Sequence, residues 1–194
     1  MNPARENILA RVRAALRVAA PKPTGPTASL PFAPVTDPAE RFRAEFLAQR
    51  GEIITDLPAF LKQFPRVVAE PALCGSALAG ATPLELSRPQ GQSHNQIASA
   101  DLGVTGCECL IAQTGTIVAR ARALSVLPPV HLVIAGLDQL VPDLAAAFAW
   151  LRQRHNGRWP DSLSFITGPS RTADIEKVLI MGAHGPKRLA LHLV

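Results

Sequence analysis

Short and almost unbroken apolar runs recur along this chain, and they constrain its fold more than any other feature. RVVAE (66–70), VHLVIAG (130–136) and RLALHLV (188–194) carry hydrophobic side chains at successive positions. Such runs are typical of strands buried on both faces, as in parallel sheets that helices cover. Segments with helical spacing, at 57–64 and 139–155, alternate with them. The sequence therefore predicts a layered α/β fold with a mostly parallel sheet and helices on both faces.

A β-hairpin is predicted where two further apolar runs almost touch. CECLIAQ (107–113) and TIVARA (116–121) are separated only by Thr114 and Gly115. Glycine supplies the positive φ that a tight turn between strands needs.

The remaining elements expected are strands at 51–55 and 162–168, a helix capped by Asp37 with Pro38 at its first position, and a helix from Arg171 to about Met181.

The N-terminal part of the chain differs from the rest in its composition. Its Ile8, Val12 and Leu16 fall on one helical stripe with arginines opposite, and six prolines follow within residues 21–38. Proline-rich segments are extended and semi-rigid. We therefore expect an amphipathic basic helix at 1–20, a linker at 21–38 and an α/β domain at 39–194. The helix either docks on its own domain or reaches a partner.

The distribution of charge argues against nucleic acid as a partner. The net charge is +5, but residues 1–22 hold five basic residues and one acid, so the remaining chain is nearly balanced. A nucleic-acid-binding domain carries its basic residues as a patch on the folded body. No apolar run approaches the roughly 18 residues that span a membrane, and the first residues lack a secretory signal. We expect a cytoplasmic protein without a membrane partner.

The number of cysteines limits which metal sites this chain can form. Iron–sulfur clusters and structural zinc sites take about four ligands, more than Cys74, Cys107 and Cys109 supply. In a strand, Cys107 and Cys109 would face one side and Glu108 the other. We interpret the cysteines as small buried thiols, and we predict no metal and no cofactor in this chain.

Two loops carry the residues best suited to bind a ligand. The first holds Gly168, Pro169, Ser170, Arg171 and Thr172 between an expected strand and an expected helix. Ser170 or Thr172 would cap that helix, and its free N–H groups with Arg171 would bind a small phosphate or carboxylate. An ordinary strand-to-helix turn explains the same residues equally well.

The second loop holds Thr114, Gly115 and Thr116, whose hydroxyl and N–H groups could donate to an anion or simply form a tight turn. Two further residues are candidates for catalysis. Glu108 is a carboxylate within an apolar run, and His184 lies between glycines on an expected loop, where it could carry a proton near neutral pH. Motifs of dinucleotide enzymes, NTPases, zinc proteases and serine hydrolases are absent.

Three segments resemble the lactate utilization protein C family, whose domain is called the LUD domain. They are LIAQTGTIVARA, LSVLPPVHLVIAG and FITGPSRTADIEKVLIMGAHGP, and the likeness covers about residues 101–194. The resemblance implies a fold like that of ribose-5-phosphate isomerase, glucosamine-6-phosphate deaminase and CoA-transferases. It also implies a cluster-free subunit or accessory protein of a system that oxidises L-lactate to pyruvate, with iron–sulfur clusters on partner subunits.

The resemblance transfers motif positions but no established catalytic residue. The matching positions are Thr114 to Thr116, Gly168 to Glu176, and His184 to Pro186. Family members often carry an acid where this chain has Gln113. If that acid serves as a base or ligand, Glu108 is the nearest substitute here. The alternative function is a stand-alone enzyme or binding protein for a small anionic metabolite.

Overall fold

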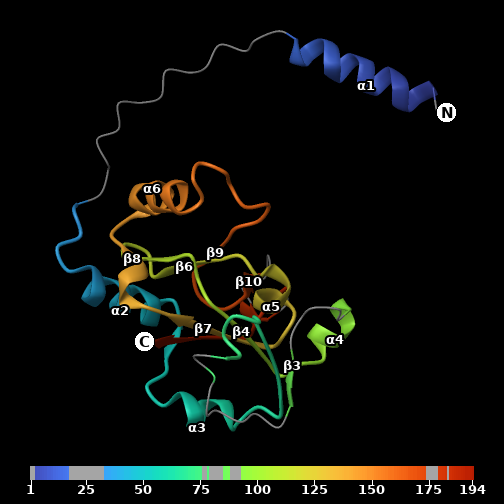
Figure 1. Cartoon of the computed structure of the whole chain (residues 1–194). Coiled ribbons are helices and arrows are strands. Elements are labelled where there is room, and N and C mark those ends of the chain that lie inside the picture. Colours follow the sequence, from blue (N-terminus) through green and yellow to red (C-terminus); the bar gives the residue numbers. More distant parts are fainter. Residues whose placement is uncertain are drawn as a thin grey trace. The chain divides into compact units, whose positions relative to one another are not determined.

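The computed structural model describes residues 3–17, 33–75, 78, 85–87, 93–173, 179–182 and 184–194 (Figure 1). The chain divides into two compact units, Met1–Ala33 and Pro34–Val194. The first contains helix α1 (Pro3–Leu16). Residues 18–32, which include most of the expected linker, lie outside the described residues. None of the helices described is both long and apolar enough to cross a bilayer.

The second unit is built on a main sheet of six strands that are all parallel. Its order is β1-β12-β7-β4-β2-β3, so the chain crosses over repeatedly to add strands. The central strands are apolar at nearly every position, as the sequence predicts for strands covered on both faces. The strands are β1 (Glu52–Ile53), β2 (Arg66–Ala69), β3 (Glu85–Ser87), β4 (Leu102–Thr105), β7 (Val130–Ala135) and β12 (Arg188–Leu193).

Helices cover both faces of the main sheet, which confirms the predicted layering (Figure 1). On one face, α3 (Leu57–Leu61) packs its buried Leu57, Phe60 and Leu61 against the sheet. The opposite face is covered by three helices, α2 (Pro38–Ala48), α4 (His94–Ala98) and α5 (Arg122–Val126), together with a second sheet.

The second sheet has four strands in the order β8-β5-β6-β9. β5 and β6 form the antiparallel hairpin predicted at Thr114 and Gly115, and Gly115 has the expected positive φ of 63°. Helix α6 (Leu144–Arg154) packs on the outer side of this sheet through the buried Ala147 and Leu151. The strands are β5 (Cys109–Ile111), β6 (Thr116–Ala119), β8 (Leu140–Val141) and β9 (Ser164–Ile166).

Side-chain caps begin the two longest helices of this unit. The Asp37 carboxylate accepts hydrogen bonds from the N–H groups of Ala39 and Glu40, both at 3.0 Å, which confirms the predicted start of α2. Asp143 accepts from Ala146 N at 2.8 Å and begins α6. Each cap satisfies N–H groups that the first turn of a helix leaves unpaired.

The expected helix at 139–155 therefore begins later than its apolar spacing suggested. Leu140 and Val141 pair instead with Leu110 and Ile111 as strand β8, and a 3-10 turn (Leu137–Gln139) precedes them. Pro142 and the Asp143 cap separate this strand from α6.

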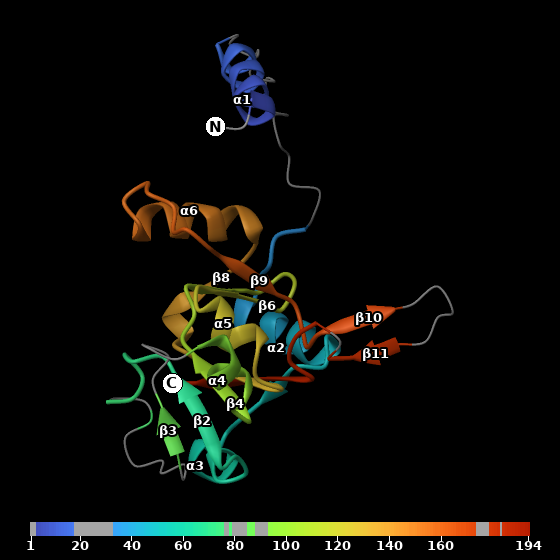
Figure 2. The ribbon, with the colours of Figure 1, turned by 90° about the vertical axis from the view of Figure 1, so that its right-hand side faces the viewer.

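The helix predicted from Arg171 to about Met181 is wrong. β10 (Arg171–Ala173) and β11 (Leu179–Met181) pair antiparallel as a second hairpin, which projects away from the two sheets in Figure 2. Residues 174–178 between them lie outside the described residues. Pairing between Arg171 and Met181 thus prevails over the local helical spacing, as tertiary context commonly does over propensity.

Candidate functional site

A pocket of about 430 Å³ opens where β2 and β4 end, and we call it the Glu70 pocket. Glu70 directly follows β2 and Gly106 directly follows β4. The carboxyl ends of parallel strands meet at one edge of a sheet, which is where open α/β folds bind ligands. The pocket is lined by Glu70, Gly106, Cys107, Glu108, Arg120, Ala121, Pro160, Asp161 and Ser162.

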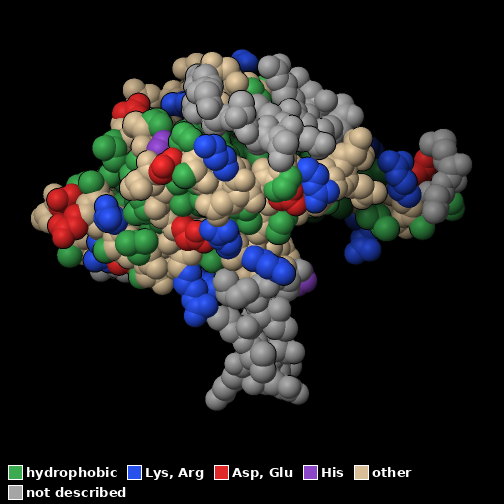
Figure 3. Space-filling model, turned by 90° about the horizontal axis from the view of Figure 1, so that it is seen from below, with side chains coloured by type: hydrophobic (Ala, Val, Ile, Leu, Met, Phe, Trp, Pro, Cys, Tyr) green, Lys and Arg blue, Asp and Glu red, His purple; other side chains and the backbone are tan. Residues whose placement is uncertain are grey.

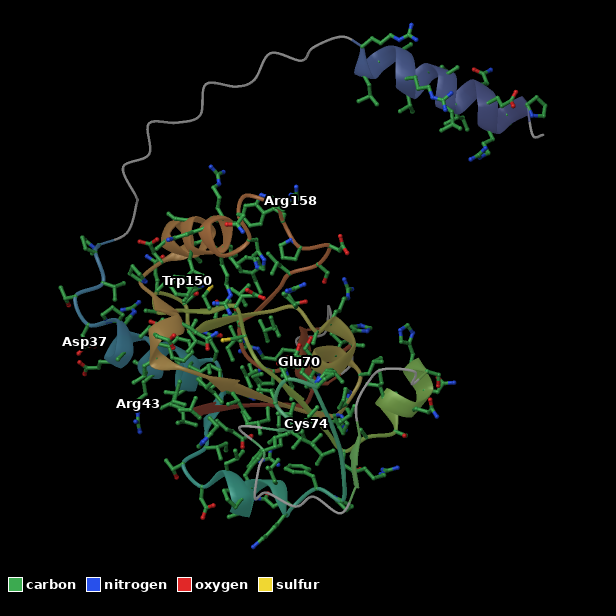
Figure 4. All side chains as sticks on the ribbon, in the orientation of Figure 1. Asp37, Arg43, Glu70, Cys74, Trp150 and Arg158 are labelled. Atoms are coloured by element: carbon green, nitrogen blue, oxygen red, sulfur yellow. The ribbon has the colours of Figure 1, made fainter. Side chains whose placement is uncertain are left out.

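Glu108 is a buried carboxylate held by two arginines and a histidine. Its Oε2 atom lies 3.1 Å from both Arg154 Nε and His155 Nε2, and its Oε1 atom lies 3.7 Å from Arg120 Nε. The Glu108 carbonyl accepts a hydrogen bond from Trp150 Nε1 at 3.0 Å. Trp150 lies on the underside of α6 in Figure 4, and its contact with Glu108 connects the start of β5 to this helix.

Removing the charge of Glu108 tests this connection. Replacement Glu108→Gln weakens the contacts to Arg154 and His155, so we expect a loss of about 1–2 kcal/mol in the free energy of unfolding. The matched control is Glu40→Gln, because Glu40 is exposed on α2. Urea denaturation at pH 7 measures both variants. Equal stability of the two variants would show that Glu108 does not hold α6.

Glu70 also lines the pocket and is labelled in Figure 4. Its Oε2 atom accepts a hydrogen bond from the Gly106 N–H at 2.7 Å. Burial raises the pKa of the Glu70 carboxyl, and the nearby Glu108 raises it further, whereas the Gly106 N–H and Arg120 lower it. Burial outweighs the other effects, so Glu70 holds a proton more readily than an exposed glutamate does.

The cysteines are free thiols, and of the three predicted to be buried Cys109 is buried, whereas Cys74 and Cys107 are half-buried. Cys107 packs with the cluster around Phe46, and Cys109 packs with the cluster under α6. They do not share a face, because β5 begins only at Cys109. Burial raises the pKa of Cys107 to about 12 and that of Cys109 to about 11, so neither is a thiolate at neutral pH.

The two loops singled out in the sequence meet in the structure. Thr116 Oγ1 lies 2.6 Å from Thr114 Oγ1 and 2.8 Å from Thr167 Oγ1, which forms a chain of three hydroxyl groups. Gly115 and Gly168, which lie next to these threonines, pack closely against the C-terminal end of α2. A Cβ on Gly115 would lie 2.4 Å from Phe46 N, and one on Gly168 would lie 2.5 Å from the Gln49 carbonyl oxygen.

The rest of the 168–172 loop is held by its neighbours rather than by a helix. The exposed Arg171 donates from Nη2 to Gln49 Oε1 at 2.7 Å, and Pro169 is buried. Ser170 N donates to the Pro186 carbonyl at 2.8 Å, and the Thr172 side chain is outside the described part. Anion binding at this loop stays a prediction, now without the helix N-terminus on which it was based.

The two catalytic candidates occupy different surroundings. His184 is exposed on the loop after β11, as predicted, and no contact among the described residues joins it to Glu108. Glu108 lies neither at a solvated edge nor alone in an apolar strand, because it is buried, pairs with Arg154 and contacts His155. A catalytic role for either residue stays a prediction.

Several residues of the Glu70 pocket were missed in the sequence. The sequence does carry a signal for Glu70 and Gly106, because each directly follows an apolar run. The carboxyl ends of parallel strands lie at the same edge of a sheet, so these two residues could have been predicted to lie close together. Arg120 and Asp161 have no such signal, since only the packing of the second sheet brings them to the pocket.

Neither a charged patch on the face of Figure 3 nor a metal site among the described residues points to another functional site. On the face shown in Figure 3, Lys and Arg side chains are interspersed with Asp and Glu. Among the residues that the structure describes, no group of three or more His, Cys, Asp or Glu side chains could hold a metal ion.

Comparisons with known proteins point in one direction. A family model described as the LUD domain matches residues 79–194. "Lactate utilization protein C" of Shouchella clausii is 35% identical over 106 residues, which are 52% of this chain and 46% of that protein. The protein of the same name from an Exiguobacterium species is 36% identical over 115 residues, 56% of this chain and 50% of its own.

The aligned part of this chain thus spans about half the length of the curated relatives it matches. Among solved structures, a DUF162 family protein from Deinococcus radiodurans superposes with a TM-score of 0.62 at 25% identity. The superposition covers 82% of this chain and 99% of that protein.

Proposed function

The chain belongs to the LUD domain family, and from this membership we propose that it serves in lactate utilization as a subunit or accessory protein. The system it serves oxidises L-lactate to pyruvate, and its iron–sulfur clusters are carried by partner subunits in the cytoplasm. The observation that supports the proposal most directly is the match to relatives that are named for lactate utilization.

Helix α1 is the segment that we propose to engage the partner subunits. The side chains of Ile8, Val12 and Leu16 follow one stripe of this helix and are 62%, 49% and 78% exposed. Amphipathic helices with such a stripe dock into apolar grooves of partner proteins. Arg11 and Arg13 flank this stripe and Arg17 lies across the helix from it, and all three side chains are exposed.

A pull-down from cells growing on L-lactate tests both parts of this proposal. We expect the tagged full chain to recover iron-containing partners, because the apolar stripe binds them. The triple variant Ile8→Ser, Val12→Ser and Leu16→Ser should recover at least tenfold less iron with an unchanged melting temperature. Ala10→Ser with Ala14→Ser, on the opposite side of α1, is the matched control. Recovery of the full chain alone and free of iron would reject the subunit role.

A second candidate function is a stand-alone enzyme or binding protein for a small anionic metabolite. The meeting of the two loops through Thr116 and Thr167 favours this alternative, because it gathers hydroxyl groups near the exposed Arg171. The full chain recovered without partners, together with phosphate or carboxylate binding that Arg171→Ala abolishes, would support it.

A further inference from the structure

Arg120 is the basic residue that lines the Glu70 pocket in the described part of the chain, and its guanidinium group forms a single long ion pair there. Its side chain is 55% exposed, and its one ionic partner among the described residues is Glu108 at 3.7 Å. Glu108 is already paired with the closer Arg154, at 3.1 Å, and also contacts His155 Nε2 at 3.1 Å. An arginine in this position can donate two parallel hydrogen bonds to the carboxylate of a ligand.

Glu70 offers a second and chemically different contact in the same pocket. Its Oε2 atom is occupied by the Gly106 N–H, whereas no partner within the described residues occupies Oε1. A carboxylate oxygen accepts hydrogen bonds from a ligand hydroxyl. Arg120 and Glu70 line the same pocket, so the two side chains can contact one small molecule bound there.

The remaining charges limit what the pocket can hold. Asp161 and Glu108 line it together with Glu70, so acidic residues outnumber basic ones along its wall. A second carboxylate on the ligand would lie near these acids and would be repelled. The volume of about 430 Å³ accommodates a small organic acid with several ordered waters.

We propose that the Glu70 pocket binds a small 2-hydroxy monocarboxylic acid, whose carboxylate contacts Arg120 and whose hydroxyl donates to Glu70. The inference rests on the proposed function in that L-lactate is the acid of this class that the system would supply. It adds a location and two contact residues, and it does not require the chain to perform the oxidation.

Calorimetric titration of the full chain at pH 7 tests the proposal with three acids. L-lactate should bind, propionate should bind at least tenfold more weakly because it lacks the hydroxyl, and L-malate should bind at least tenfold more weakly because of its second carboxylate. Absence of L-lactate binding, or equal binding of the three acids, would overturn the proposal.

Variants identify the contacts. Arg120→Gln should lower the affinity for L-lactate at least tenfold, whereas Arg122→Gln, at the neighbouring exposed arginine, should leave it unchanged. Glu70→Gln keeps an oxygen for the Gly106 N–H and should abolish the preference for L-lactate over propionate. Melting temperatures confirm that each variant is folded. Unchanged L-lactate affinity in a folded Arg120→Gln variant would exclude this pocket.

The outcome is independent of the pull-down. If the pocket proposal fails, iron-containing partners are still recovered with the full chain, and the subunit role stands. If the subunit role fails, L-lactate binding that depends on Arg120 still stands as a property of the isolated protein.

Discussion

Replacement of Gly115 by alanine should destabilise the Pro34–Val194 unit by about 3–4 kcal/mol. Two costs combine at this position. The φ of Gly115 is 63°, which a residue with a Cβ adopts only with strain, and the added Cβ would lie 2.4 Å from the backbone nitrogen of Phe46. Backbone cannot move aside as a flexible side chain can, so α2 must shift away from the hairpin. Urea denaturation monitored by circular dichroism measures the loss.

Two other glycines separate these costs. Gly157 has a φ of 74° with nothing within 4 Å of an added Cβ, so Gly157→Ala should lose only about 1 kcal/mol. Gly75 has open space and no positive φ, so Gly75→Ala should be close to neutral. If Gly115→Ala costs no more than Gly157→Ala, the close packing of the hairpin on α2 is refuted.

The protein should lose about 3 kcal/mol of stability between pH 7 and pH 4 through His131 alone. This side chain is fully buried in β7, and burial lowers its pKa from 6.5 to about 3. Below pH 6.5 the unfolded chain therefore binds a proton that the folded chain refuses. Stability falls as the pH drops from 6.5 towards 3, and it is unaffected by this residue above 7.

The variant His131→Gln tests this dependence, because glutamine does not titrate and can still bond to Thr105, whose Oγ1 lies 2.9 Å from the His131 Nε2 atom. We expect the fall in unfolding free energy between pH 7 and pH 4 to be about 3 kcal/mol smaller in this variant than in the natural chain. His94→Gln, at an exposed histidine of α4, should leave the fall unchanged. The same pH dependence in all three proteins would mean that His131 accepts a proton in the folded state.

The sequence predicts correctly those elements that are held by interactions between residues close together along the chain. The Asp37 cap, the Gly115 turn and the apolar strands each depend on a few neighbouring residues, and all are confirmed. Residues 171–181 have helical spacing too, but the pairing of Arg171 with Met181 makes a hairpin of them. No local pattern distinguishes these outcomes, because the choice depends on a contact ten positions away.

The candidate site was predictable only in part for the same reason. Glu108 was visible as an acid in an apolar run, and the two loops were visible as clusters of hydroxyl groups and glycines. The cations that neutralise Glu108 come from the end of α6 and from the end of β6. Their approach to Glu108 is a product of packing between elements, which a single sequence does not display.

The position of β12 has a consequence for the synthesis of this protein. β12 lies between β1 and β7, and Ile53 pairs with Leu191 across most of the chain. A nascent chain that has not yet released residue 193 from the ribosome leaves the inner edges of β1 and β7 unpaired. Unpaired edges and exposed apolar faces promote aggregation, and non-local parallel pairing is slow. The main sheet therefore stays open until β12 has been synthesised, and its closure is a late step in the folding of this unit.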